Sequence, residues 1–174
     1  MVAAAPLLRA DDSTGQGGDA VVRRLTQDQY RRIIADVFGP TIKVGGRFEP
    51  DIRRDGLIAV GAGAVSVTAS GFEQYDGIAR NVAAQVVSAQ HRATLVPCTP
   101  KSATEPDDAC AGQFLSSVGR LLYRRPLTND ELSGRVQVAS AAATKLKDFY
   151  AGLGTSLATL LVSPHFLFRE ENVE

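Results

Sequence analysis

Residues 123–132 read YRRPLTNDEL, and this stretch places two helices and the turn between them. Pro126 cannot continue a helix, because it lacks a backbone N–H and its ring collides with the preceding turn. Thr128, followed three residues later by Glu131, forms the pattern of a capping box, which begins a helix. The stretch therefore predicts one helix that ends just before the proline and another that begins at Thr128.

Similar capping and breaking signals predict five helices in all. Their expected starts are Thr26, Ser70, Asp107 or Asp108, Thr128 and Asp148. The first should end at Gly39-Pro40, the second near Ala89 and the last at Leu161. Apolar residues at helical spacing are expected to face the core. In the second and third helices these are Phe72, Tyr75, Ile78, Ala79, Val82, Val86, Phe114, Leu115, Val118, Leu121 and Leu122.

The predicted fold class is all-α, with about five helices in an irregular bundle. Residues 40–69 form a glycine-rich insert, in which a short β-hairpin across Gly61–Gly63 and an irregular packed loop are equally compatible with the composition. We predict a flexible tail over residues 1–21 and a first helical module over 22–97. A second helical module is expected over 98–162, followed by a further module or docking tail from 163 to 174.

Composition argues against two classes of partner. Lys+Arg and Asp+Glu are balanced at 19 each, so no net charge favours nucleic acid or an anionic membrane. No apolar run reaches the roughly 18–20 residues that span a bilayer. The first eight residues are apolar but lack a basic start, so they are too little for a complete signal peptide and fit the remnant of an export signal.

Cys98 and Cys110 bracket a polar loop rich in proline and aspartate. Two isolated cysteines that close a short loop predict a disulfide in an exported protein. The alternative is two free, partly buried cysteines in a cytosolic protein. A zinc site is weaker, because the spacing exceeds that of a Cys-x-x-Cys pair and no histidine lies nearby to complete the ligand set.

No catalytic, cofactor-binding or metal-ligating residue stands out, so the sequence leaves open whether the chain is part of an enzyme. Covalent haem needs Cys-x-x-Cys-His, which is absent. His91 and His165 are the only histidines, and His165 in an apolar run is more typical of a packed side chain than of a ligand. His165 could in principle hold a metal together with Glu170 and Glu171. Acidic residues at this position are more typical of a solvated chain end than of a metal site.

Two interpretations of the arginine pair remain open. Arg124 and Arg125 can offset the partial negative charge of a helix C-terminus, or one of them can hold a carboxylate of another domain through its two-pronged guanidinium. The segment from Pro164 to Phe168 is apolar and would be exposed without a partner. The candidate docking residues are Arg124, Arg125, His165, Phe166, Phe168 and Arg169.

Three blocks carry a family resemblance: VRRLTQDQY (22–30) with IADVFG (34–39), then Cys110-Ala111 with YRRPLT (123–128), then LLVSPHFLFRE (160–170). They resemble the N-terminal modules of large exported bacterial proteins of the planctomycete type. Those proteins are built from consecutive domains of unknown function and are often linked to c-type cytochrome modules. Gln29 replaces the usual acid of the first block, and an aromatic–Asp–Asn segment expected near residues 56–64 is absent.

The resemblance implies that this chain is the N-terminal part of a longer exported, periplasmic protein, with the remaining domains or subunits as its partners. The leading hypothesis is a non-catalytic helical module that docks those parts. The alternative is a part of a redox or electron-transfer assembly whose c-type haem is carried by another domain or subunit.

Overall fold

A computed structural model describes residues 21–51 and 67–171, and seven helices and two short strands lie in these ranges. In chain order they are β1 (Val21–Arg24), α1 (Gln27–Phe38), α3 (Ala69–Val86), α4 (Arg92–Leu95), α5 (Asp108–Tyr123), α6 (Asn129–Leu146), α7 (Phe149–Leu161), α8 (Pro164–Leu167) and β2 (Phe168–Glu171). The all-α prediction is confirmed. No helix in the described ranges has the length and apolarity needed to cross a membrane.

The five predicted helices correspond to the five long ones. The capping boxes at Thr26 and Thr128 are both present, each with its reciprocal side chain three residues later. Asp107 caps α5 by accepting the Cys110 N–H, and Asp148 caps α7 by accepting the Ala151 N–H.

Three details of the helix predictions are wrong. Helix α3 begins at Ala69 and is capped by Thr68, which accepts the Gly71 N–H at 2.9 Å, so Ser70 is not its cap. Phe72 is 48% exposed, because Gly71 takes the inward position in the first turn and leaves Phe72 at the edge of the buried stripe. Leu121 is 49% exposed, because the buried stripe of the last turn of α5 passes through Leu122 and Tyr123.

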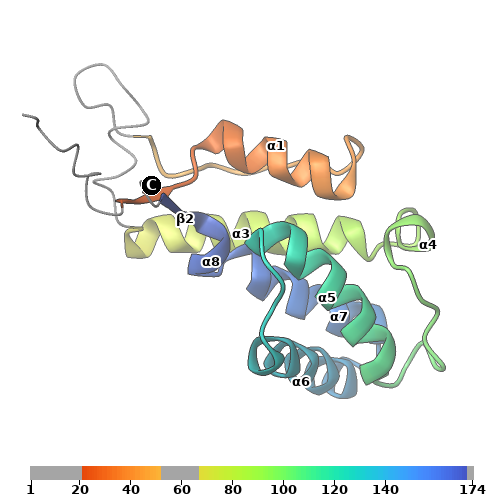
Figure 1. The fold of residues 1–174 in the computed structure, drawn as a ribbon. Coiled ribbons are helices and arrows are strands. Elements are labelled where there is room, and N and C mark those ends of the chain that lie inside the picture. Colours follow the sequence, from red (N-terminus) through yellow and green to blue (C-terminus); the bar gives the residue numbers. More distant parts are fainter. Residues whose placement is uncertain (1–20, 52–66, 172–174) are drawn as a thin grey trace, which may run out of the picture.

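Helix α7 lies at the centre of the packing, in contact with α3, α5 and α6 (Figure 1). It is apolar on most sides, as expected for a helix surrounded by others. Helix α1 lies on the other side of α3 from α6 (Figure 1). One hydrophobic cluster runs through the described residues, from Leu25 near the start to Leu167 near the end.

An antiparallel two-stranded sheet, absent from the sequence-based expectation, joins the two ends of the described chain. Strand β1 pairs with β2 so that Arg23 lies opposite Arg169 and Arg24 opposite Phe168. The hairpin predicted around Gly61–Gly63 lies outside the described residues, as does the tail predicted over residues 1–21 except for Val21, which begins β1. The sheet places the segment after α7 against the start of α1, where the Leu25 N–H donates to the Leu167 carbonyl at 2.7 Å.

An aromatic cluster lies beside this sheet. The Tyr30 ring is surrounded by Phe166 at 5.1 Å, Phe48 at 5.3 Å and Tyr75 at 6.0 Å between ring centroids. Tyr30 and Phe166 are fully buried. The expectation that the apolar segment 164–168 would be exposed is therefore wrong for Phe166 and Leu167, because Tyr30 of α1 covers Phe166 and helices α5 and α7 pack against α8.

The predicted disulfide between Cys98 and Cys110 is present, with the two Cα atoms 5.6 Å apart. It fixes the first turn of α5 to the start of the loop that follows α4. Its presence is compatible with an oxidising compartment.

Removing this cross-link should destabilise the fold. In the chain-entropy model, a loop of this length stabilises the native state by roughly 3 kcal/mol. We expect reduction with dithiothreitol to lower the free energy of unfolding, measured by urea titration, by about 2–4 kcal/mol. A Cys98→Ala/Cys110→Ala double variant should have the same free energy of unfolding as the reduced protein. Dithiothreitol should not change the stability of this variant. Equal midpoints for the oxidised and reduced protein would contradict the prediction.

Candidate functional site

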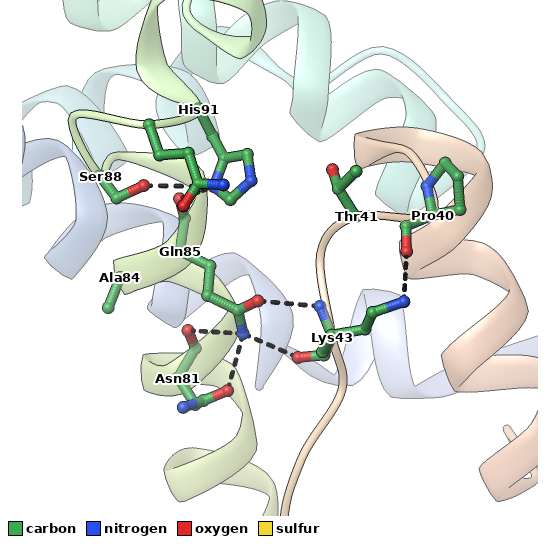
Figure 2. A pocket seen from close by; sticks show the side chains of 9 residues that line it. Pro40, Thr41, Lys43, Asn81, Ala84, Gln85, Ser88 and His91 are labelled. Atoms are coloured by element: carbon green, nitrogen blue, oxygen red, sulfur yellow. Dashed lines mark hydrogen bonds between the residues drawn. The ribbon is translucent and has the colours of Figure 1, made fainter.

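An open depression of about 720 Å³ lies between the segment after α1 and the C-terminal end of α3 (Figure 2). The Gln85 amide joins its two sides. Its oxygen accepts the Lys43 N–H at 2.8 Å, and its nitrogen donates to the Lys43 carbonyl at 2.7 Å. The Lys43 ammonium donates to the Pro40 carbonyl, just past the end of α1. Gln85 and Lys43 therefore fasten the segment after α1 to α3.

His91 is the most reactive residue type in this depression, and it lies near Ser88. Its Nδ1 is 3.0 Å from the Gln85 carbonyl and 3.2 Å from the Ser88 hydroxyl (Figure 2). A carbonyl can only accept a hydrogen bond, so Nδ1 carries the proton and cannot take one from Ser88. The pair therefore lacks the base–nucleophile relation that a serine hydrolase requires. Its observed role is to satisfy a carbonyl at the end of α3.

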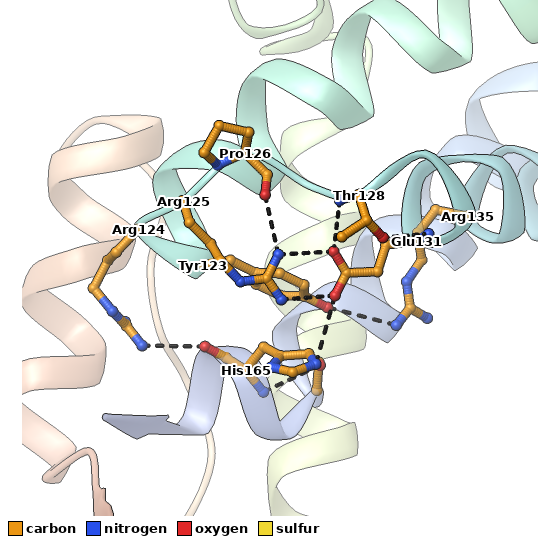
Figure 3. A network of polar contacts seen from close by, with 9 residues as sticks. Tyr123, Arg124, Arg125, Pro126, Thr128, Glu131, Arg135 and His165 are labelled. Carbon is orange, nitrogen blue, oxygen red and sulfur yellow. Dashed lines mark hydrogen bonds and ion pairs between the residues drawn. The ribbon is translucent and has the colours of Figure 1, made fainter. Parts of the chain in front are cut away.

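The second polar cluster is built on the junction between α5 and α6 (Figure 3). Arg124 ends α5 in the left-handed region, with φ 59°, and so turns the chain out of the helix. Pro126 follows, and Thr128 caps α6 by accepting the Glu131 N–H. In return, a Glu131 carboxylate oxygen accepts the Thr128 N–H at 2.8 Å.

Glu131 also receives a two-pronged contact from Arg125. The Arg125 Nη1 donates to Oε2 at 2.8 Å, and Nη2 donates to Oε1 at 2.7 Å. This is the bidentate guanidinium–carboxylate geometry, but its carboxylate belongs to the same junction rather than to another domain. The Arg125 hydrogen bonds, followed by the Thr128 N–H, lower the pKa of Glu131 to about 2.

Arg124 ends α5, but its side chain bonds to backbone carbonyls of α8 and β2. Its Nη2 donates to the carbonyls of His165, at 3.1 Å, and Phe168, at 2.9 Å. These carbonyls lie in α8 and at the start of β2, so Arg124 fixes the C-terminal segment to the end of α5. Burial, followed by the charge of Arg169, lowers the pKa of Arg124.

The cluster extends to α7 and α8 through aromatic and hydroxyl groups. The His165 ring lies 5.3 Å from the Tyr123 ring, and its Nε2 is 3.5 Å from Glu131. Arg135 on α6 donates to the Thr159 hydroxyl at 2.9 Å. The network thus links α5, α6, α7 and α8 around a single carboxylate (Figure 3).

The six predicted docking residues therefore have unequal exposure. Phe166 is in the core and Phe168 is half-buried, whereas His165 and Arg169 are exposed. Arg124 and Arg125 are already engaged by carbonyls and by Glu131. Docking by the exposed members stays a prediction.

Sequence reasoning missed a buried charge cluster beside the two-stranded sheet. Arg24 is only 2% exposed, and its Nη1 is 2.6 Å from a carboxylate oxygen of Glu49. Its Nη2 donates to the Pro50 carbonyl and lies 3.7 Å from Asp51. In a β-strand, successive side chains point to opposite faces, so one of Arg23 and Arg24 must face inward. This alternation could have indicated a buried arginine, but only if residues 21–24 had been predicted as a strand.

In both clusters an arginine pairs with a carboxylate of the same fold: Arg125 with Glu131, and Arg24 with Glu49. In the part of the chain that the structure describes, no three His, Cys, Asp or Glu side chains are grouped so that they could hold a metal ion. Neither cluster pairs a nucleophile with a base that could accept its proton.

The low pKa of Glu131 predicts that the free energy of unfolding falls as the pH is lowered. A carboxyl whose pKa falls from 4.5 to about 2 on folding stabilises the native state above pH 4.5 and loses this contribution as the pH falls to 2. Glu131→Gln should therefore lower the free energy of unfolding at pH 7 by about 1–2 kcal/mol, since the pair is partly exposed. At pH 2, variant and wild type should converge.

Urea titrations at several pH values would measure this difference. Glu105→Gln, at an exposed loop position, is the matched control and should leave the free energy of unfolding unchanged at every pH. A Glu131→Gln effect of the same size at pH 2 and pH 7 would show that the ion pair is not its cause.

Two family models match the chain, on either side of the loop before α5. Residues 23–88 match a family of proteins of unknown function (DUF1587), and residues 110–171 match another (DUF1595). Both are domains of unknown function found in multi-domain proteins of the planctomycete type. No curated protein and no solved structure matches the chain. The junction cluster lies inside the second matched region, and Arg24 inside the first.

Proposed function

We propose that this chain is a non-catalytic helical module that supports and docks other parts of a larger exported protein. The proposal rests on one observation: the charged side chains of Arg124, Arg125 and Glu131 bond to other parts of the same fold. Arg124 holds the carbonyls after α7, and Arg125 and Glu131 hold each other. Charged groups that bond to the rest of the fold in this way stabilise it, which supports a structural role.

The packing between the two matched regions supports a single supporting unit. Phe166, from the second region, lies against Tyr30, from the first, with ring centroids 5.1 Å apart. Strands β1 and β2 come from the same two regions. Removing either region would leave an apolar surface of the other exposed, so we expect the two to fold and work together.

The disulfide between Cys98 and Cys110 supports an exported location, because such bonds persist in oxidising compartments. The matches to domains found in multi-domain proteins support the presence of further domains as partners. A c-type haem carried by such a partner remains part of the proposal, with no haem ligand assigned to this chain.

Cross-linking mass spectrometry of the protein purified under native conditions from its source tests the proposal. Lys43, Lys101, Lys145 and Lys147 are exposed amines in the described ranges and would react with a lysine-directed reagent. We expect cross-links from them to peptides outside this sequence. An isolated protein of 18.5 kDa without any such cross-link would overturn the proposal. A Soret band in a stoichiometric complex would identify a haem-carrying partner.

A further inference from the structure

Arginines gather where β2 meets the end of α5. Arg23 on β1 and Arg169 on β2 are directly opposite each other in the strand register. Arg124 reaches the same place from α5, because its Nη2 donates to the carbonyl of Phe168, the residue before Arg169. Segments far apart in the sequence thus bring Arg124 and Arg169 to the same end of the two-stranded sheet.

Like charges in such proximity disfavour the folded state unless something compensates them. Arg169 is exposed and forms no ion pair with any described side chain. Glu131, within the junction, already has both oxygens bonded to Arg125. The charge of Arg169 also contributes to lowering the pKa of Arg124.

Arg124 keeps hydrogen-bonding capacity for a further acceptor. Only its Nη2 is used, on the carbonyls of His165 and Phe168. Within the described ranges, its Nη1 and Nε donate to no other residue. Two backbone contacts hold the group in place, so little side-chain freedom is lost when it binds an anion.

We propose that Arg124 and Arg169 form a docking site for a carboxylate-bearing polypeptide segment. This inference rests on the proposed docking function and names the chemistry of the partner surface. Guanidinium forks fit carboxylates with two parallel hydrogen bonds. The sheet has only two strands in the described ranges, so an extended polypeptide can also reach backbone groups at its edge. A small inorganic anion would use the charges but not that edge.

Fluorescence anisotropy with a fluorescein-labelled hexaglutamate peptide tests the site on the intact chain. We expect binding in low-salt buffer that weakens as salt is added, because exposed charges are screened. Arg169→Gln should raise the Kd about fivefold to tenfold, which corresponds to loss of one charge-assisted contact of roughly 1 kcal/mol. No hydrogen bond or ion pair of the Arg169 side chain is seen in the described ranges, and the substitution keeps the backbone of β2, so circular dichroism of the variant should match the wild type.

Arg32→Gln on α1 is the matched control, since it removes the same charge from an exposed position away from the sheet. Its Kd should stay within about twofold of wild type. Equal weakening by both variants, or no peptide binding, would overturn the proposed site. So would displacement of the peptide by inorganic phosphate at equal concentration, because the site would then be a general anion site. Cross-links to other domains could still appear in each case, so the proposed function is judged separately.

Discussion

Replacing Arg24 by methionine should lower the free energy of unfolding by about 3–5 kcal/mol, among the largest effects expected for one substitution in this chain. The guanidinium is buried and holds Glu49 at 2.6 Å and the Pro50 carbonyl at 3.1 Å. Its loss leaves a partly buried carboxylate and a carbonyl without their donor. Breaking a buried pair from one side is costly, because the remaining charge has lost both water and partner.

The position of Glu49 explains why its carboxylate cannot easily move to solvent when Arg24 is replaced. Its carboxylate lies against the first turn of α3 at Gly71, where an added Cβ would come within 2.6 Å of the carboxyl carbon. A negative charge is favoured at a helix N-terminus, so Glu49 joins Arg24 to the start of α3. Burial raises the pKa of Tyr75, and its neutral phenol offers Glu49 no positive charge in place of Arg24.

Urea unfolding of four variants, Arg24→Met, Glu49→Gln, the double variant and a control at Arg32, would test this account. Arg32→Met, at an exposed position of α1, should change the free energy of unfolding by less than about 0.5 kcal/mol. The double variant Arg24→Met/Glu49→Gln should recover part of the loss, because it removes the unpaired charge. A double variant that sums the two single effects would show that Arg24 and Glu49 are not coupled.

Gly152→Ala should destabilise the protein by about 1–3 kcal/mol, although helix propensity alone would favour alanine by about 1 kcal/mol. Gly152 is buried on α7 at its closest approach to α6. A Cβ there would lie 2.5 Å from the Ala139 carbonyl oxygen and 2.6 Å from the Ala143 nitrogen. Both are backbone atoms of α6, so the clash can be relieved only by moving one helix away from the other.

Gly134→Ala is the matched control for this prediction. Gly134 lies inside α6, and an added Cβ would meet nothing within 4 Å. Alanine should therefore stabilise the protein there by roughly 0.5–1 kcal/mol, through helix propensity and reduced entropy of the unfolded chain. Thermal or urea unfolding should move the two variants in opposite directions. A stabilised Gly152→Ala would show that α6 and α7 can separate at little cost.

The local parts of the fold were predictable because their causes are local. Thr26 and Thr128 form capping boxes with side chains three residues away, and Cys98 and Cys110 close a short loop. The exceptions were also local. Thr68, rather than Ser70, caps α3, because both are competent caps and packing chose the earlier one.

The roles of the candidate residues were less predictable. The junction at residues 123–132 was correctly read as helix end, turn and cap. The partners of its two arginines were not: Arg125 binds Glu131 in its own junction, and Arg124 caps a segment more than forty residues away. Exposure of the apolar run after Pro164 was predicted wrongly for Phe166, since its cover comes from Tyr30.

The sequence by itself determined where most of the long helices begin and end and which cysteines pair. Each of these depends on residues within a dozen positions of one another. Only the tertiary structure decided that β1 pairs with β2, that Arg24 is buried and that Gly152 must lack a side chain. Those outcomes depend on which distant surfaces meet, and contacts between distant segments leave no periodic trace in the residues that make them.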